Sequence, residues 1–170
     1  MEVVELAALT EQEHVELIAG EEHPWGAAGE GLQWREKDRR LGVRDSDGRL
    51  LALAGASIVD IEVEDAGSFQ VVGLGGLFVT RSARGDGLLW RLAGPLLALA
   101  EEMGPDRAML FCGPGLIPVY RRLGFTAIES PVWADQPGGR LEVPMGAMWR
   151  ALRGFTAWPP GRVDVQGLPF

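Results

Sequence analysis

A turn that carries glycine and arginine stands between two apolar segments near the middle of the chain. This turn, Thr80–Gly87, follows a strand-like run and precedes a helical pattern. Backbone N–H groups at the start of a helix have no partner inside the helix, and with the helix dipole they favour an anion such as a phosphate. Gly85 and Gly87 allow a close approach to the backbone, and Arg81 and Arg84 add positive charge. The turn lacks the Gly-Lys-Ser/Thr ending of a Walker A loop, so it predicts a phosphate site of another kind.

Two features on either side of this turn add to its chemistry. The run before it contains Gly73, Gly75 and Gly76, and glycines inside a strand indicate a bulge or the close approach of another group. After it, a second helical segment carries Tyr120, the only tyrosine in the chain, and ends at Gly124. A phenol with a reference pKa near 10 is a suitable proton donor to a forming thiolate of pKa near 8–9.

Two motifs in this stretch together resemble the GNAT superfamily of acetyl-CoA-dependent N-acetyltransferases. Arg84–Leu89 matches the family's pyrophosphate loop, Arg/Gln-x-x-Gly-x-Gly/Ala, and Tyr120–Phe125 matches its Tyr-x-x-x-Gly-Phe segment. The resemblance implies an α+β fold, in which helices flank a mixed, mostly antiparallel sheet. It also implies direct transfer of an acetyl group from acetyl-CoA, the co-substrate, to a primary amine in a ternary complex, without a metal.

The resemblance assigns roles to individual residues. The strand backbone at Leu77, Phe78 and Val79 lies where the family bonds the pantetheine arm, as an added strand would. Backbone N–H groups of the loop bind the pyrophosphate, and the loop residues here are Arg84, Gly85, Asp86, Gly87, Leu88 and Leu89. Cys112 ends the neighbouring strand, across the gap that holds the thioester. Tyr120 lies where many members use a phenol as general acid toward the leaving thiolate.

The chain departs from the family pattern at three places. Leu89 stands where most members have Gly or Ala, so its side chain must point away from the phosphates. Gly113 stands where many members have Asn. The strand Phe69–Val79 holds no carboxylate, although many members place a Glu near the position of Gly75 to take the proton of the amine. The general base must therefore come from elsewhere or be a water molecule.

The acceptor groove of the family is formed by the first helical region, a late loop and the C-terminal segment. Here these regions carry acidic and aromatic residues, which the resemblance assigns to acceptor binding: Glu21, Glu22, Trp25, Trp34, Trp133, Asp135, Asp164 and Phe170. Aromatic faces beside carboxylates suit a sugar that bears ammonium groups. The tryptophan-containing tail is also similar to that of the aminoglycoside 2′-N-acetyltransferases. These features predict that the acceptor is a cationic small-molecule amine. Among such amines, an aminoglycoside antibiotic fits them best.

Two alternatives stay open at this point. The acceptor could instead be a polyamine, a metabolite amine or a peptide N-terminus. The chain could also be a non-catalytic module that binds acyl-CoA, because Gly75 replaces a carboxylate.

Composition sets further bounds. A chain of 170 residues corresponds to roughly one domain, so we expect residues 1–170 to form a single domain with a tail at 155–170. A formal net charge of −8 argues against nucleic acid and favours a cationic partner. One cysteine excludes an intramolecular disulfide, and two histidines leave little for a metal site. No apolar run is long enough for a membrane span, and the N-terminal segment lacks the basic residues of an export signal. We expect a cytoplasmic protein without a membrane partner; pairing as a homodimer is common in the family.

Periodicity and turn signals place the candidate residues on elements. Thr10 and Glu13 form a capping-box pattern that predicts a helix near 10–19. The later elements are predicted as strands at Leu41–Arg44, Leu50–Glu64 and Phe69–Thr80, a helix from Leu89 to Met103, a strand at Ala108–Cys112, a helix at Pro114–Leu123, and strands at Phe125–Val132 and Met145–Arg153. The Pro/Gly-rich segment 154–170 predicts an irregular tail, and the mixed-charge run Arg35–Arg40 predicts a solvated face.

Overall fold

The computed structural model describes residues 1–22, 27–154 and 157–170, and within them one mixed, mostly antiparallel sheet of ten strands. The strands are β1 (Glu2–Leu6), β2 (Arg39–Arg44), β3 (Leu50–Val63), β4 (Gly67–Val79), β5 (Arg107–Cys112), β6 (Thr126–Ile128), β7 (Val132–Ala134), β8 (Leu141–Glu142), β9 (Gly146–Ala151) and β10 (Val163–Val165). The helices are α1 (Glu11–Ile18), α2 (Leu88–Glu102) and α3 (Ile117–Arg122), with short 3-10 turns at Ala27–Gly29, Arg81–Ala83 and Pro114–Leu116. This architecture confirms the predicted α+β fold class.

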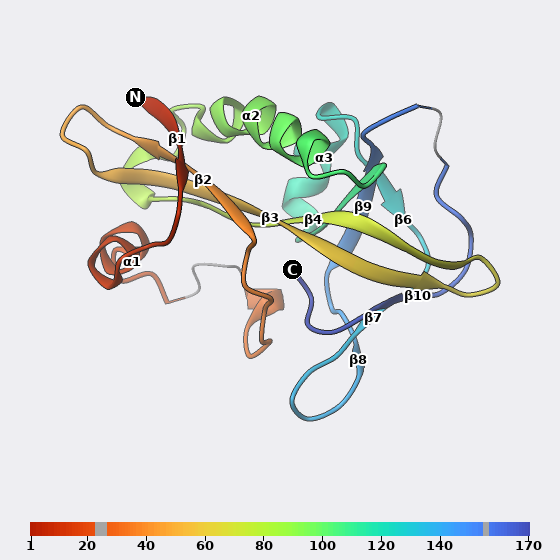
Figure 1. Ribbon diagram of the computed structural model, residues 1–170. Helices are drawn as coiled ribbons and strands as arrows, with labels where there is room; N and C mark the ends of the chain where they lie inside the picture. Colours follow the sequence, from red (N-terminus) through yellow and green to blue (C-terminus); the bar gives the residue numbers. More distant parts are fainter. Residues whose placement is uncertain (23–26, 155–156) are drawn as a thin grey trace.

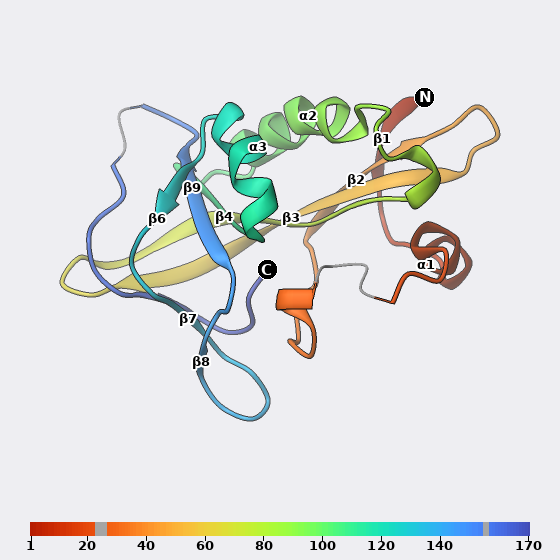
Figure 2. The ribbon, with the colours of Figure 1, turned by 180° about the vertical axis from the view of Figure 1, so that it is seen from behind.

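The sheet separates two layers. Helices α2 and α3 cover one face, and the C-terminal segment and the chain before β2 lie on the opposite side (Figures 1 and 2). On the helix side, Leu88, Leu92 and Ala100 of α2 are buried in a core with Val72 and Leu74 of β4. On the other side, a second core forms around alternate residues of the same strands, such as Val71 of β4 and Met109 of β5. The period of two along each strand thus supplies both cores.

The predicted helices form where their local signals lie. Thr10 caps α1: its hydroxyl accepts from the backbone N–H of Glu13, and the Glu13 carboxylate accepts from the backbone N–H of Thr10. Helix α2 begins after Gly87, which adopts a left-handed conformation, and no side chain caps this end. The helix continues past Pro95 to Glu102. The helix predicted at Pro114–Leu123 is shorter than expected, because its first residues form the 3-10 turn Pro114–Leu116 and α3 begins only at Ile117.

A bulge and a separation of strands interrupt the centre of the sheet. The β3–β4 register shifts between Leu53 and Gly55, and Gly76 lies in the bulge with a φ of 62°. Strand β4 pairs in parallel with β5 only at Val72–Leu74, opposite Ala108–Leu110. The rest of β4, from Gly75 to Val79, continues without β5 as its neighbour. The glycines of this strand therefore mark a bulge, as the sequence predicts.

The C-terminal segment differs from its predicted form. Residues Val163–Val165 are a strand, β10, which pairs antiparallel with β3 and parallel with β7. The predicted strand Phe125–Val132 was also wrong as one element, because it divides into β6 and β7 around Pro131, a residue that cannot donate to a strand ladder. Strands β1, β8 and β10 were not predicted. The ten strands of the described residues, from β1 near the start to β10 near the end, belong to one sheet.

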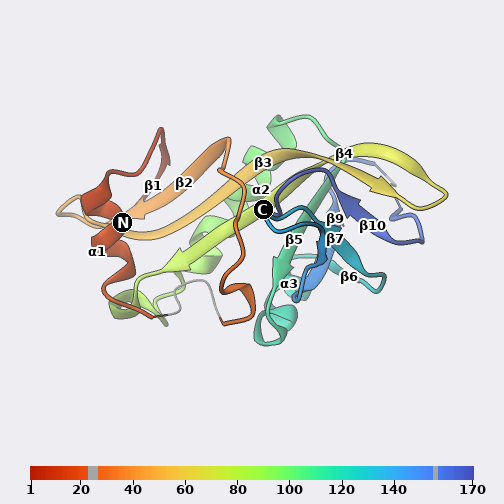
Figure 3. The same ribbon diagram turned by 90° about the horizontal axis from the view of Figure 1, so that it is seen from below.

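The C-terminal segment ends near the middle of the sheet, on the side away from α2 and α3 (Figures 1 and 3). The Phe170 ring is buried and packs on the Phe111 ring, with centroids 5.0 Å apart. A Cβ at Gly73 would lie 2.5 Å from two ring carbons of Phe170, and a Cβ at Gly75 would lie 2.7 Å from its backbone carbonyl carbon. Both glycines are therefore needed for the close approach of this residue, and a carboxylate side chain at position 75 has no room.

Replacing Gly73 by alanine is expected to lower the free energy of unfolding by about 1–3 kcal/mol, because the new methyl group overpacks the Phe170 ring. Urea unfolding followed by tryptophan fluorescence measures the change. Gly115→Ala is the matched control, since no atom lies within 4 Å of a Cβ at that position. Equal losses in the two variants would contradict the packing role of Phe170.

Candidate functional site

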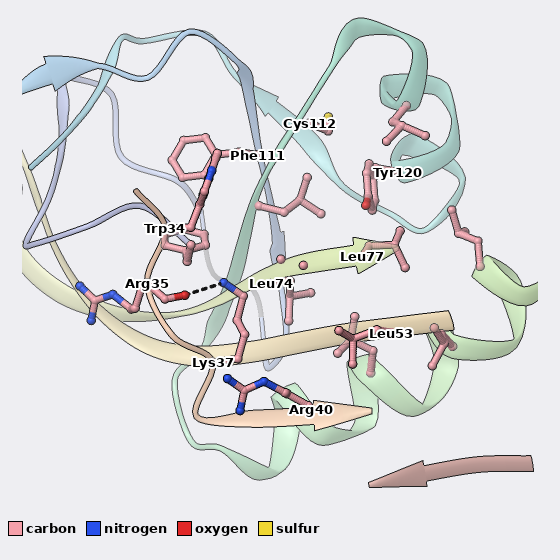
Figure 4. A pocket seen from close by; sticks show the side chains of 18 of the residues that line it. Trp34, Arg35, Lys37, Arg40, Leu53, Leu74, Leu77, Phe111, Cys112 and Tyr120 are labelled. Carbon is pink, nitrogen blue, oxygen red and sulfur yellow. Dashed lines mark hydrogen bonds between the residues drawn. The ribbon is translucent and has the colours of Figure 1, made fainter. Parts of the chain in front are cut away.

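A pocket opens where β4 separates from β5, with a volume of about 1030 Å³ (Figure 4). Its floor is the bulged part of β4 at Leu74–Leu77, and its far wall is the end of β5 at Leu110–Cys112. Side chains of α2 and α3 line it on one side of the sheet, and Trp34, Lys37 and Phe170 line it on the other. The volume is large for a small-molecule site. Beyond Leu74, the edge of β4 does not pair with β5. Because of this separation, the backbone groups on that edge face the pocket.

Three of the residues predicted to contact the coenzyme line the pocket. Leu77 comes from the bulge, Leu89 from the first turn of α2, and Cys112 from the end of β5. Phe78 is buried on the other side, in a core with Leu6, Leu17 and Leu53. Leu88 is buried under α2. For Phe78, Val79 and Leu88, a contact with a ligand would therefore use the backbone.

The glycine-bearing loop lies beside the pocket with the geometry of an anion site. Gly85 and Gly87 have φ values of 95° and 74°, and the exposed loop residues place no side chain on the start of α2. Arg84 is oriented by two partners: its Nε donates to the backbone carbonyl of Val79 at 3.1 Å, and its Nη2 donates to both carboxylate oxygens of Glu21 at 2.6 and 2.7 Å. The loop thus presents a helix N-terminus whose first-turn N–H groups are open to a ligand.

Tyr120 points from α3 into the pocket, across from Leu77 and close to Cys112 (Figure 4). Its ring packs edge-on against Phe125, with centroids 5.9 Å apart. The turn that holds Phe125 is fixed by Gly124, which has a φ of 82°, and by the N–H of Phe125 donating to the carbonyl of Tyr120. Burial raises the pKa of the Tyr120 phenol above its usual value, and a charge on Cys112 would raise it further. The phenol is therefore protonated at neutral pH and available as a donor.

Cys112 is less suited to covalent chemistry. Burial raises the pKa of its thiol, so the nucleophilic thiolate is disfavoured. Its place in the pocket wall fits a packing role beside a bound ligand.

Aromatic residues dominate the side of the pocket opposite the helices. Trp34 meets Phe111 edge-on at 6.3 Å between centroids, and Phe111 in turn meets Phe170. Arg35 secures this arrangement, because its backbone N–H donates to the carbonyl of Pro169 at 2.7 Å and its guanidinium donates to the carbonyls of Leu168 and Gln166. Of the residues predicted to bind the acceptor, Trp34 and Phe170 line the pocket.

The other predicted acceptor residues lie elsewhere. Glu21 pairs with Arg84, and Glu22 is exposed outside the pocket lining. Asp135 accepts from the backbone N–H of Gly167, and Asp164 pairs with Arg162. Trp133 lies on β7, also outside the lining, and Trp25 lies outside the described residues. The structure therefore engages Glu21, Asp135 and Asp164 in holding loops and strands.

Lys37 is a pocket residue that the sequence did not reveal. It lies in the mixed-charge run whose predicted solvated face is wrong for this side chain, because Lys37 is packed over Gly55 and beside Gly75 and Gly76. A Cβ at Gly55 would lie 2.5 Å from its Cγ. The missed signal is the glycine at position 55 on β3, which leaves room for a side chain from another segment.

Within residues 1–22, 27–154 and 157–170, no group of three or more His, Cys, Asp or Glu side chains could hold a metal ion. None of the helices in this same part of the chain is long and apolar enough to span a membrane.

Known proteins resemble this chain both in sequence and in fold. A family model described as an acetyltransferase (GNAT) domain matches residues 24–128. Among solved structures, the chain is similar to the GNAT family N-acetyltransferase YhbS from Escherichia coli in complex with CoA, with a TM-score of 0.63, 18% identity, and coverage of 96% of this chain and 88% of that one. It is also similar to the ribosomal-protein-S18-alanine N-acetyltransferase from Escherichia coli, with a TM-score of 0.55, 16% identity, and coverage of 93% and 100%. At these identities the two structures show a shared fold. No curated protein matches the chain.

The raised pKa of Tyr120 has a consequence that one titration can measure. Since Tyr120 is the only tyrosine, tyrosinate absorbance reports this phenol alone. The unfolded chain loses the proton near pH 10, whereas the folded protein keeps it to higher pH. Stability should therefore fall as the pH rises above about 10. A spectroscopic titration of native protein, with guanidinium-unfolded protein as control, should show a midpoint that is higher in the native state; coincident midpoints would contradict the burial of the phenol.

Proposed function

Because the chain belongs to the GNAT acetyltransferase family, and is thus an acetyl-CoA-dependent N-acetyltransferase, we propose that it acetylates a small primary amine held against Trp34, Lys37 and Phe170. The observation that carries this proposal is the position of Tyr120 across a single pocket from β4. In this part of β4, the edge that faces the pocket is not paired with β5. The loop at Arg84–Leu89 enters the same pocket through Leu89. One ligand can therefore reach from the loop to the bulge.

The backbone of β4 and the start of α2 would hold acetyl-CoA. Strand-like bonding to Leu77 and Val79 aligns the pantetheine arm, and the N–H groups of residues 84–89 accept the pyrophosphate charge. Leu89, which replaces a small residue of the family pattern, lines the apolar pocket, so its side chain does not crowd the phosphates.

The transfer would proceed by direct attack of the amine on the thioester. Backbone N–H groups near the bulge polarise the carbonyl, which stabilises the charge that develops on its oxygen. Tyr120, which is protonated at neutral pH and points into the pocket, gives its proton to the departing thiolate of coenzyme A. Holding the two substrates in one pocket supplies much of the remaining rate enhancement.

The acceptor is proposed from the charges around the pocket. The exposed carboxylate of Glu11 lines the pocket, whereas Glu36 there is paired with Arg40. Glu11 and the net charge of −8 favour an amine that arrives as a cation. Trp34, Phe111 and Phe170 offer flat apolar surfaces to its body. Half-buried Lys37 opposes a second positive charge next to the reacting nitrogen. An acceptor with one amine on an apolar body is therefore our first choice, and an aminoglycoside is the second, favoured by Glu11 and the net charge.

A thiol-release assay tests the proposal, with acetyl-CoA and a panel of amines: aromatic monoamines, aminoglycosides, spermidine, amino acids and short peptides. Fastest release with an aromatic monoamine supports the first choice, and fastest release with an aminoglycoside supports the second. Release with spermidine or a peptide alone contradicts both acceptors. No release with any amine contradicts the proposed small-amine acceptor.

Tyr120→Phe is expected to lower kcat by about 10²–10⁴-fold, because it removes the proton donor and keeps the ring contact with Phe125. The Kd of acetyl-CoA, measured by calorimetry, should be unchanged. Phe125→Tyr changes the other ring of the Tyr120–Phe125 contact and keeps Tyr120, so it serves as a control for effects of ring packing. An unchanged kcat in Tyr120→Phe rules out the acid role.

Arg84→Glu is expected to weaken acetyl-CoA binding about tenfold, close to 1.4 kcal/mol, because it places a negative charge beside the anion loop and next to Glu21. Calorimetry measures the change. Arg49→Glu is the matched control, since Arg49 pairs with Asp45 on the turn between β2 and β3, outside this pocket. Equal effects of the two substitutions would indicate general charge repulsion and contradict a local role for the loop.

A further inference from the structure

Lys37 is the only lysine in the chain, although the chain has 16 basic residues. Arginine stays charged at all accessible pH values, whereas a lysine amine can lose its proton and become a nucleophile. The single residue of this kind lies in the pocket. Within the described part of the chain, the other primary amine is the α-amino group of exposed Met1 at the start of β1.

The side chain of Lys37 is held at the bulge of β4. Its Cε would lie 3.3 Å from a Cβ at Gly75 and 3.6 Å from one at Gly76. Its Nζ is one bond further, and donates a hydrogen bond to the carbonyl of Arg35 at 3.1 Å (Figure 4). These glycines are the point at which β4 leaves β5, opposite Tyr120, so the amine opens into the same space as the proposed thioester site.

The backbone on either side of Lys37 is fixed to β3. The N–H of Asp38 donates to the carbonyl of Ala56 at 3.0 Å, and the Asp38 carboxylate accepts from the N–H of Ile58 at 2.8 Å. The Ser57 hydroxyl donates to the carbonyl of Glu36 at 3.1 Å. The amine is therefore positioned by an ordered segment rather than by a mobile surface chain.

The surroundings of the amine favour its neutral form. Gly55, Gly75 and Gly76 face it from β3 and β4 without charge, and Glu36 pairs with Arg40 rather than with Lys37. Burial, with a contribution from Arg40 and Arg35 that Glu36 and Asp38 oppose, lowers the pKa of Lys37 to about 8. Across the pocket, Tyr120 and Cys112 are neutral at this pH, because burial raises both of their pKa values. A neutral amine can keep its hydrogen bond to Arg35 while its lone pair stays free.

From this placement we propose that Lys37 is a self-acetylation site, at which acetyl-CoA bound in the pocket acetylates Nζ of the same chain. The inference rests on the proposed function, because it needs acetyl-CoA in the groove between β4 and β5. It adds a covalent modification of the enzyme itself, which takes place when no acceptor occupies the pocket.

The step is a simple acyl transfer. The Nζ lone pair forms a bond to the thioester carbonyl carbon, and the C–S bond breaks with its electron pair on sulfur. Tyr120 protonates the thiolate, the amide nitrogen releases one proton, and solvent returns a proton to the phenol. The products are acetyl-lysine and coenzyme A. The modified residue has lost its charge and places a methyl group between Gly76 and Phe170, where it reduces the space for an acceptor.

Intact-protein mass spectrometry with acetyl-CoA alone tests the proposal, with peptide mapping to locate the acetyl group. We expect one acetyl group on Lys37, with a rate that rises about tenfold between pH 7 and pH 9 as an amine of pKa about 8 loses its proton. An excess of coenzyme A should suppress the reaction, because it occupies the same groove. Lys37→Arg keeps the positive charge and should gain no acetyl group in the pocket.

A surface lysine gives the matched control. Arg49 is exposed on the turn between β2 and β3, so Arg49→Lys in the Lys37→Arg background carries one lysine away from the pocket. Acetylation of that lysine at the rate of Lys37, or acetylation of Lys37 that coenzyme A does not suppress, overturns the proposal. Acetyl-CoA that raises Tm and supports amine turnover without modifying Lys37 overturns it and leaves the proposed function intact. Acetyl-CoA that neither raises Tm nor supports turnover overturns both.

Discussion

The separation of β4 from β5 is the constraint on which the rest of the site depends. Two parallel strands that paired along their whole length would satisfy each other's backbone and leave no room for a ligand. Here pairing stops after Leu74 and Leu110, because the bulge at Gly76 turns β4 away from its neighbour. The backbone groups released in this way, Leu89 at the start of α2 and the phenol of Tyr120 then line one pocket. A ligand that adds to β4 as a further strand completes the sheet.

The opposite wall is built from two segments far apart in the sequence. Arg35 binds the carbonyls of Gln166, Leu168 and Pro169, so the segment before β2 and the segment after β10 are tied to each other. Strand β10 anchors the second segment between β3 and β7. Phe170 is thereby placed against Gly73 and Gly75. This part of β4 carries no acidic side chain, and an aromatic residue and a lysine from other segments pack against it instead.

Electrostatics within the pocket differ from the charge of the whole chain. The net charge is −8, yet several carboxylates that could have faced an acceptor serve as structural partners: Glu21 for Arg84, Asp135 for Gly167, and Asp164 for Arg162. Lys37 lies beside the bulge, and burial lowers its pKa to about 8, so its amine is partly neutral at mildly alkaline pH. The net charge therefore affects the rate at which a charged ligand approaches, whereas local burial sets the pKa values of the groups that the ligand contacts in the pocket.

The sequence alone determined the features whose cause is local. The capping box at Thr10, the glycine loop before α2, the position of Tyr120 near Gly124 and the bulge glycines of β4 follow from signals within a few residues. The resemblance of the loop and of the Tyr120 segment to a known family gave the fold class. Tertiary structure decided what lies across the pocket. Nothing near Lys37 in the sequence indicates that Gly55, Gly75 and Gly76 make room for it, and nothing near Val163 indicates that β3 and β7 leave a place for a strand. These contacts join residues far apart in the chain, so their energies depend on the packed sheet and not on local propensity.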